Sequence, residues 1–144
     1  MDNREVAKEF IGFLIKLKKY MRAEVSKSRS SNITEQQFRT LMNLKQSGKC
    51  TLKELSGRIH VSNSSLCIML NKMVEEGIVQ REIDDKDRRN TFYNLSNCGR
   101  KFLEKELDKK LLTMGDKIGN LSEEEKEKFI VYLKGIEEII EKIK

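Results

Sequence analysis

The spacing of apolar residues predicts long amphipathic helices toward both ends of the chain. Within residues 4–28, Phe10, Leu14, Leu17 and Met21 follow one another at intervals of four, three and four, so they share one face of a helix. The same pattern recurs in two C-terminal stretches, at Leu103, Leu107, Leu111, Met114 and Ile118 and at Phe129, Leu133, Ile136, Ile140 and Ile143. The last stretch has the 4-3-4-3 spacing of a coiled-coil seam.

Shorter helices are predicted in the middle of the chain. TEQQ at residue 34 and TLKE at residue 51 are capping boxes, in which a Thr hydroxyl and a Gln or Glu side chain satisfy the first N–H groups of a helix. Ser62 can cap a fourth helix, whose apolar stripe is Leu66, Met69, Leu70 and Met73. SEEE at residue 122 is a third capping box, for the last helix.

Two short alternating runs follow, at residues 79–84 and 90–95, joined by the charged segment DKDRR. Period-two alternation around a polar connection predicts a β-hairpin. Ser96 can then cap the helix that follows. The predicted fold class is mainly α with a small β-hairpin wing: a winged helix-turn-helix flanked by N- and C-terminal helices.

The helix that begins after Ser62 has an unusual outer face. Opposite its apolar stripe it shows small or polar residues, with no acid before Glu75. A helix that enters the DNA major groove needs such a face, because small residues let the backbone approach the base edges and hydroxyls and amides can bond bases or phosphates. The alternative is the solvated face of an ordinary surface helix.

The hairpin tip favours the DNA-binding interpretation. Lys86, Arg88 and Arg89 would reach toward the negative minor groove beside the recognition helix. Asp87 stands two residues before Arg89, where its carboxylate can accept the guanidinium N–H groups and orient the arginine. The alternative is that the acids only stabilise a solvated turn, in which ion pairs contribute at most about 1 kcal/mol.

From residue 61 to residue 99, the stretch VSNSSLCIMLNKMVEEGIVQREIDDKDRRNTFYNLSNCG resembles the MarR family of winged-helix regulators. Asp87 and Arg89 match the family's D-x-R wing, and Leu95, Ser96 and Gly99 match its closing L-[ST]-x-x-G pattern. The resemblance implies a homodimer in which the terminal helices interlock and two winged helices read a palindromic operator.

The apolar seams agree with a dimer, because a chain of 144 residues has little else with which to cover them. The alternative is an internal helical core. The chain also departs from the family. Ile68 stands where many relatives have a basic or polar base reader, so contact would shift to a thymine methyl or direct readout would weaken.

Charge and composition are compatible with this interpretation. The net charge is +6, and the excess lies in the first two-thirds of the chain, which favours an anionic partner. No signal peptide and no apolar run long enough to span a membrane are present, so a cytoplasmic protein is expected. Cys50, Cys67 and Cys98 form no C-x-x-C pair, which argues against a disulfide framework or a zinc ribbon.

Catalytic and cofactor motifs are missing from the sequence. With one histidine, His60, and no P-loop, Rossmann fingerprint or G-x-S-x-G, we expect no enzyme, no cofactor and no metal site. His60 is interpreted as a turn residue or a phosphate contact. Family members commonly respond to small molecules or oxidants, so a small-molecule effector is expected by resemblance, at a site that the sequence does not identify. Cys67 lies on the recognition helix and is the one candidate for a redox response.

The combined prediction is a homodimeric, ligand-responsive transcriptional repressor that binds double-stranded DNA. Residues 34–100 form the DNA-binding winged helix and residues 1–33 and 101–144 the dimerisation region of one compact domain. The predicted DNA-binding residues are Ser62, Asn63, Ser64, Ser65, Ile68, Asn71, Lys72, Lys86, Arg88 and Arg89, with Asp87 as the wing-orienting residue. The alternatives are a non-specific architectural winged helix, an RNA-binding winged helix, or a redox-responsive regulator that uses Cys67.

Overall fold

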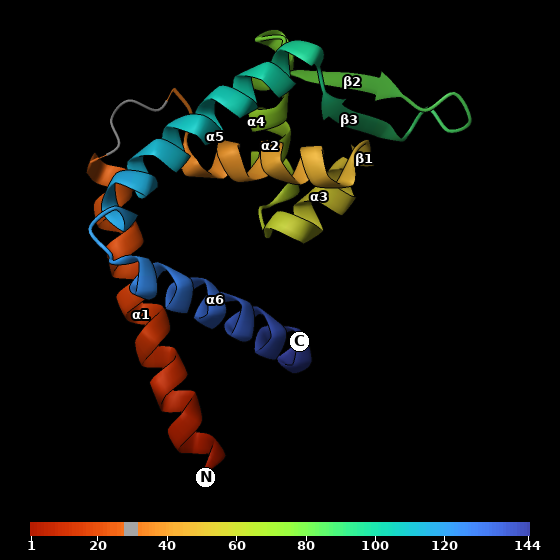
Figure 1. Cartoon of the computed structure of the whole chain (residues 1–144). Helices are drawn as coiled ribbons and strands as arrows, with labels where there is room; N and C mark the ends of the chain where they lie inside the picture. The colour runs from red at the N-terminus through yellow and green to blue at the C-terminus, as the bar shows by residue number, and fades with distance from the viewer. Residues whose placement is uncertain (28–31) are drawn as a thin grey trace. The chain divides into compact units, whose positions relative to one another are not determined.

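The computed structural model describes residues 1–27 and 32–144 (Figure 1). The elements in chain order are α1 (Asn3–Lys27), α2 (Glu35–Ser47), β1 (Cys50–Thr51), α3 (Leu52–Ile59), α4 (Asn63–Glu75), β2 (Val79–Ile83), β3 (Thr91–Leu95), α5 (Asn97–Ile118) and α6 (Glu123–Ile143). Contacts divide the chain into two units, Met1–Leu103 and Glu104–Lys144. The mainly α fold with a winged helix-turn-helix is confirmed.

The helices begin at the residues that the capping motifs predicted. Thr34 Oγ1 accepts the backbone N–H of Gln37 at 3.1 Å, and the Gln37 side chain accepts the backbone N–H of Thr34 at 2.9 Å. Complete capping boxes also form at Thr51 with Glu54 and at Ser122 with Glu125. Each box satisfies N–H groups that no turn of its own helix can satisfy.

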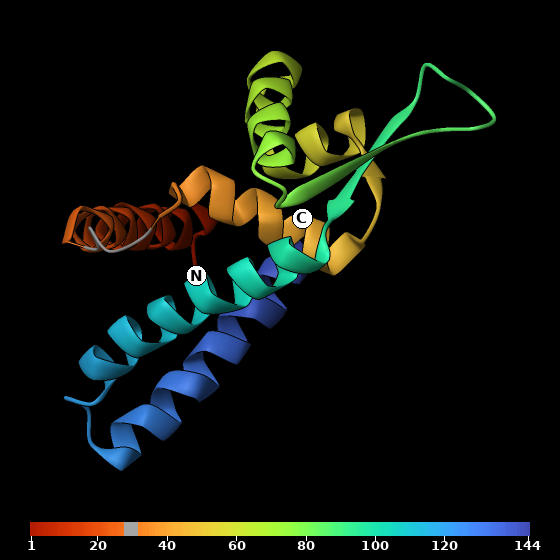
Figure 2. The same cartoon turned by 90° about the horizontal axis from the view of Figure 1, so that it is seen from above.

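The sheet contains a strand that the pattern of the sequence did not predict. Its order is β1-β3-β2, so the hairpin of β2 and β3 gains a third antiparallel strand. Cys50 pairs with Tyr93, and Thr51 pairs with Phe92. β1 has two residues, too few to show any alternation. Its pairing anchors the base of the wing to the loop between α2 and α3. Beyond that base, the hairpin extends as an arm past α2, α3 and α4 (Figures 1 and 2).

One apolar core joins the helices of the winged helix to its sheet. Its buried members are Leu41, Leu44, Cys50, Leu55, Ile59, Leu66, Leu70, Met73, Val79, Tyr93, Leu95 and Leu103. α4 packs against α3 and β2 through the stripe that the periodicity predicted, with Met69 only partly buried. His60 has φ 54° and ψ 47° and ends α3, so its interpretation as a turn residue is confirmed.

Ser96 and Gly99 form a tight junction between the exit from α4 and the start of α5. The Ser96 hydroxyl donates toward the carbonyl oxygens of Gly77 and Ile78 and accepts the Gly99 backbone N–H at 2.9 Å. Gly77, at φ 76°, makes the left-handed turn that releases the chain from α4 into β2. A Cβ on Gly99 would lie 1.9 Å from the carbonyl oxygen of Ile78, so only glycine fits.

The helices toward the two ends of the chain leave large apolar side chains exposed. In α1 these are Val6, Phe10, Ile11, Phe13, Leu14, Ile15, Leu17, Tyr20 and Met21. In α6 they are Phe129, Ile130, Val131, Tyr132, Leu133, Ile136, Ile139 and Ile143. α6 has no buried residue at all. Within the part of the single chain that the structure describes, therefore, no other element covers the apolar face of α6.

Replacing Gly99 with alanine should destabilise the winged helix. The new methyl group would force β2 away from α5, which we expect to lower the free energy of unfolding by about 3 kcal/mol. Urea denaturation followed by circular dichroism, at one fixed protein concentration, measures this change. The matched control is Gly57→Ala in α3, where a Cβ meets nothing within 4 Å. Gly57→Ala should raise stability by about 0.5–1 kcal/mol. Equal effects of the two substitutions would contradict the close contact at Gly99.

Candidate nucleic-acid interface

The recognition helix α4 begins with a short chain of hydroxyl groups. Ser62 is its N-cap, and Ser62 Oγ accepts the backbone N–H of Ser65 at 3.3 Å. The same oxygen donates to Ser65 Oγ at 3.0 Å and lies 3.4 Å from Ser64 Oγ. Three small polar side chains thus gather around the positive end of a helix. There the remaining backbone N–H groups favour an anion such as phosphate.

The predicted contact residues of α4 do not share one environment. Asn63, Ser64, Ser65, Ile68 and Lys72 are exposed. Asn71 is half-buried instead: its amide nitrogen donates to Cys67 Sγ at 3.6 Å, and its carbonyl oxygen is fully buried without a hydrogen-bond partner. The Asn71 oxygen is therefore not presented to a base edge in this conformation, because the side chain turns back along the helix toward Cys67.

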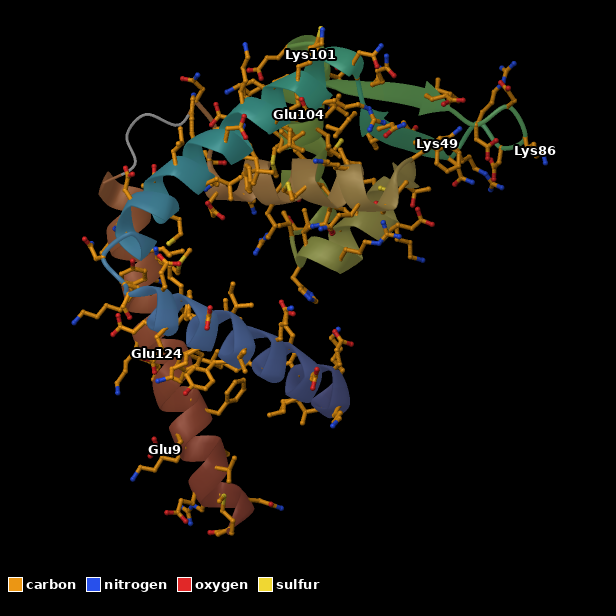
Figure 3. The ribbon with its side chains drawn as sticks, in the orientation of Figure 1. Glu9, Lys49, Lys86, Lys101, Glu104 and Glu124 are labelled. Carbon is orange, nitrogen blue, oxygen red and sulfur yellow. The ribbon has the colours of Figure 1, made fainter. Side chains whose placement is uncertain are left out.

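The wing tip is ordered by its own aspartates. The Asp84 carboxylate accepts the backbone N–H of Lys86 at 3.0 Å, and the Asn90 N–H donates to the Asp87 carbonyl at 2.9 Å. The Asp84 N–H in turn donates to the Asn90 carbonyl at 3.0 Å and closes the loop. Lys86 lies out in this loop, beyond the paired part of the hairpin (Figure 3).

Asp87 holds Arg89 by a bidentate pair. Arg89 Nε donates to Asp87 Oδ1 at 3.1 Å, and Nη2 donates to Oδ2 at 3.2 Å. The Arg89 side chain is nevertheless 90% exposed, against 38% for Asp87. The guanidinium therefore has a set direction while most of its surface stays open to a partner, which lowers the entropy lost on binding.

The pair also changes the titration of Asp87. Hydrogen bonds from the Arg89 side chain, and then from its backbone N–H, hold the pKa of the Asp87 carboxyl below its usual range. A carboxyl with a depressed pKa in the folded state is fully ionised above its ordinary pKa. The pair is therefore present at neutral pH and is lost only as the pH falls through the depressed value.

The described residues form neither a cluster of metal-binding side chains nor a membrane-spanning helix. Across residues 1–27 and 32–144, no group of three or more His, Cys, Asp or Glu side chains could hold a metal ion. None of the helices in this described part of the chain is long and apolar enough to cross a bilayer.

Part of the chain matches a known family model. The model of the MarR family matches residues 33–91, from the start of α2 to the first residue of β3. Among curated proteins, the chain is 28% identical over 86 residues to the uncharacterized HTH-type transcriptional regulator YwhA of Bacillus subtilis, a match that covers 60% of this chain and 62% of YwhA. It is 26% identical over 107 residues to the organic hydroperoxide resistance transcriptional regulator of the same organism, covering 74% of this chain and 63% of that protein. The chain thus matches less than two thirds of the length of each of these two relatives.

Solved structures share the fold across most of the chain. Wild-type MarR from Escherichia coli, in its apo form, superposes with a TM-score of 0.76 at 24% identity, covering 87% of this chain and 94% of that one. A MarR family protein from Bacillus stearothermophilus superposes with a TM-score of 0.75 at 24% identity, covering 97% of this chain and 98% of that one. Residues 33–91 of the chain thus match the MarR family, and most of the chain has the fold of these MarR structures.

The MarR match covers α4 and the wing tip and ends before the closing L-S-x-x-G pattern. The Ser96 and Gly99 contacts give that pattern a physical reason: the hydroxyl joins two chain segments, and the glycine lets them approach. The D-x-R motif likewise corresponds to an observed bidentate pair rather than to two independent charges.

The wing contains one ion pair that no motif of the sequence predicts. Lys49, at the base of the wing (Figure 3), places Nζ 3.1 Å from Glu82 Oε2 and 4.8 Å from the centre of the Phe92 ring. Glu82 and Phe92 are partners across β2 and β3. The lysine thus links the two strands of the wing and neutralises an acid that would repel DNA. These positions are far apart in the sequence, and none belongs to a motif, so no signal in a single sequence would have joined them.

Replacing Asp87 with alanine tests whether the carboxylate orients the arginine. Removing a negative charge would by itself strengthen binding to DNA, whereas losing the orientation should weaken it. We expect Asp87→Ala to weaken DNA binding about two- to tenfold, because the Arg89 side chain would then have to be ordered when DNA binds. Fluorescence anisotropy with labelled duplex measures the affinity. The control is Asp85→Ala, at an exposed acid of the same loop, which should bind as tightly as wild type or more tightly. Tighter binding by both variants would show that Asp87 only repels DNA.

Proposed function

We propose that this protein is a sequence-specific, double-stranded DNA-binding transcriptional regulator that acts as a homodimeric repressor on a palindromic operator. The observation that carries the proposal is the combination of an exposed polar face on α4 with a wing whose arginine is already held in place by Asp87. The names of its MarR relatives as HTH-type transcriptional regulators support the same function.

Each predicted contact residue except Asn71 has a role in this proposal. Asn63, Ser64, Ser65 and Ile68 face base edges in the major groove, while Ser62 and Lys72 contact phosphates. Arg89 enters the minor groove, with Arg88 and Lys86 beside it. Asn71 is left out of the base contacts, because its carbonyl oxygen is buried and its amide bonds to Cys67. A redox role for Cys67 is left out too, since its thiol is half-buried against that amide.

The dimer is proposed from the apolar faces of the terminal helices. Residues 34–100 would bind DNA, and residues 1–33 and 101–144 would form the dimer interface. Apolar faces of this extent on α1 and α6 are uncommon in proteins that stay monomeric, and a two-fold axis would bury both copies at once. A small-molecule effector belongs to the proposal as well, at a site that we do not assign. No enzymatic activity is proposed, because the relatives are regulators.

Binding to the DNA upstream of the protein's own gene, compared with scrambled DNA over a salt series, tests the proposed function. We expect tight binding to the native sequence, with two subunits per site, and much weaker binding to the scrambled one. Arg89→Ala should weaken specific binding about tenfold or more, because the contact with the minor groove is lost. Lys134→Ala, which removes the same charge from α6, should bind as wild type does.

Two results would contradict this proposal. Equal, weak affinity for native and scrambled DNA would favour a non-specific architectural winged helix, and preference for RNA would favour an RNA-binding one. Unchanged affinity of Arg89→Ala at moderate salt would overturn the role of the wing.

The dimer interface has its own test. Leu14→Glu places a charge on the apolar face of α1, where Leu14 is 43% exposed in the single chain. We expect dissociation to monomers in sedimentation equilibrium, because burying an unpaired carboxylate in the interface costs several kcal/mol. Lys16→Glu introduces the same side chain on the opposite face of α1 and should stay dimeric. A dimeric Leu14→Glu variant would exclude this face from the interface.

A further inference from the structure

Ile68 is an apolar side chain in the middle of the polar outer face of α4. Within residues 34–100, all of which the structure describes, only Ile68 and Ile83 are large, apolar and exposed. Ile68 is the more exposed of the two, at 74%. It stands on the helix directly opposite the buried stripe of Leu66 and Leu70, so it has no part in the core.

Folding does not explain an isoleucine at this position. Its neighbours one turn away on the helix surface are the exposed Ser64, Ser65 and Lys72 and the half-buried Asn71, all of them polar. A β-branched side chain is also a poorer helix former than the long polar residues that usually cover a solvated face. The apolar surface of Ile68 is therefore available to a partner that is itself mostly polar and has one apolar group to match.

The hydroxyl chain beside Ile68 has a direction. The Ser62 hydroxyl donates to Ser65 Oγ, while in its 3.4 Å contact with Ser64 Oγ either hydroxyl can be the donor. Since Ser65 Oγ accepts within this chain, its own proton points away from it. Ser65 therefore presents a hydrogen-bond donor on the same face as Ile68, and it needs an acceptor from its partner.

We propose that α4 reads two adjacent base pairs in each half-site: a thymine, through its 5-methyl group against Ile68, and a purine, through an N7 acceptor bonded by the Ser65 hydroxyl. The proposal rests on the proposed function. In the major groove the thymine methyl is the one apolar group on a base edge, and N7 is an acceptor on both purines. Residues 65 and 68 are separated by about 4.5 Å along the helix axis, close to the spacing of one base-pair step.

The experiment begins with selection of a binding site from random duplex DNA by the wild-type protein. Each thymine of the selected site is then replaced by deoxyuridine, which lacks only the methyl group. We expect one thymine per half-site at which the replacement weakens binding about fourfold, as loss of one buried methyl group predicts. Replacing both symmetry-related thymines should weaken binding about fifteenfold.

Protein variants at Ile68 and Ser65 assign the two contacts to side chains. Ile68→Ala should bind the thymine and deoxyuridine sites equally, whereas Ile68→Val, which keeps an apolar side chain branched at the Cβ, should still distinguish them. At the neighbouring pair, 7-deazapurine removes the N7 acceptor and should weaken wild type about fivefold but leave Ser65→Ala unchanged. Lys72→Ala is the matched control: it should bind more weakly at every site and keep both discriminations. Circular dichroism confirms that each variant is folded.

The outcomes separate this inference from the proposed function. A selected site with no thymine sensitive to the methyl group, or one whose sensitivity persists in Ile68→Ala, would overturn the methyl contact and leave the regulator intact. An equal loss of affinity for 7-deazapurine DNA in wild type and in Ser65→Ala would overturn the hydrogen bond from Ser65 to N7. Failure to select any sequence would overturn the proposed function and this inference with it.

Discussion

The hydroxyl of Ser96 is the interaction on which the arrangement of the winged helix depends. It bonds the carbonyl oxygens of Gly77 and Ile78, where the chain leaves α4, and it caps α5 through the Gly99 N–H. The end of the recognition helix, the start of the wing and the start of α5 are therefore held at one point. The absence of a side chain on Gly99 is what allows these segments to approach, since even a methyl group would overlap a backbone oxygen.

Apolar packing and electrostatic interactions together shape the surface that we propose to bind DNA. Apolar packing of Leu66, Leu70 and Met73 decides which face of α4 turns outward. Electrostatics then shape the wing: Asp87 directs Arg89, and Lys49 neutralises Glu82 at the base. Acids in a DNA-binding wing are thus consistent with its proposed role, because Glu82, Asp84 and Asp87 each bond a cation or a backbone N–H.

The terminal helices α1 and α6, unlike the winged helix, leave their apolar faces uncovered. Their apolar faces remain exposed in the single chain, and α6 buries none of its residues. A winged helix with its own core and terminal helices without one is the arrangement expected if the terminal helices complete their packing only between two copies. In the proposed dimer, the two recognition helices would then be held in a fixed relation by surfaces that play no part in reading DNA.

The sequence by itself determined most of the local structure and the fold class. Capping boxes placed the starts of α2, α3 and α6, and periodicity identified the stripe that α4 buries, because these features depend on neighbours within one or two turns. Only the tertiary structure showed β1, since a two-residue strand exists through its pairing with β3 and has no pattern of its own. The same holds for the site. The D-x-R spacing indicated the Asp87–Arg89 pair. The turning of Asn71 toward Cys67 and the joining of Lys49, Glu82 and Phe92 were decided by packing between segments far apart in the chain, which no local pattern records.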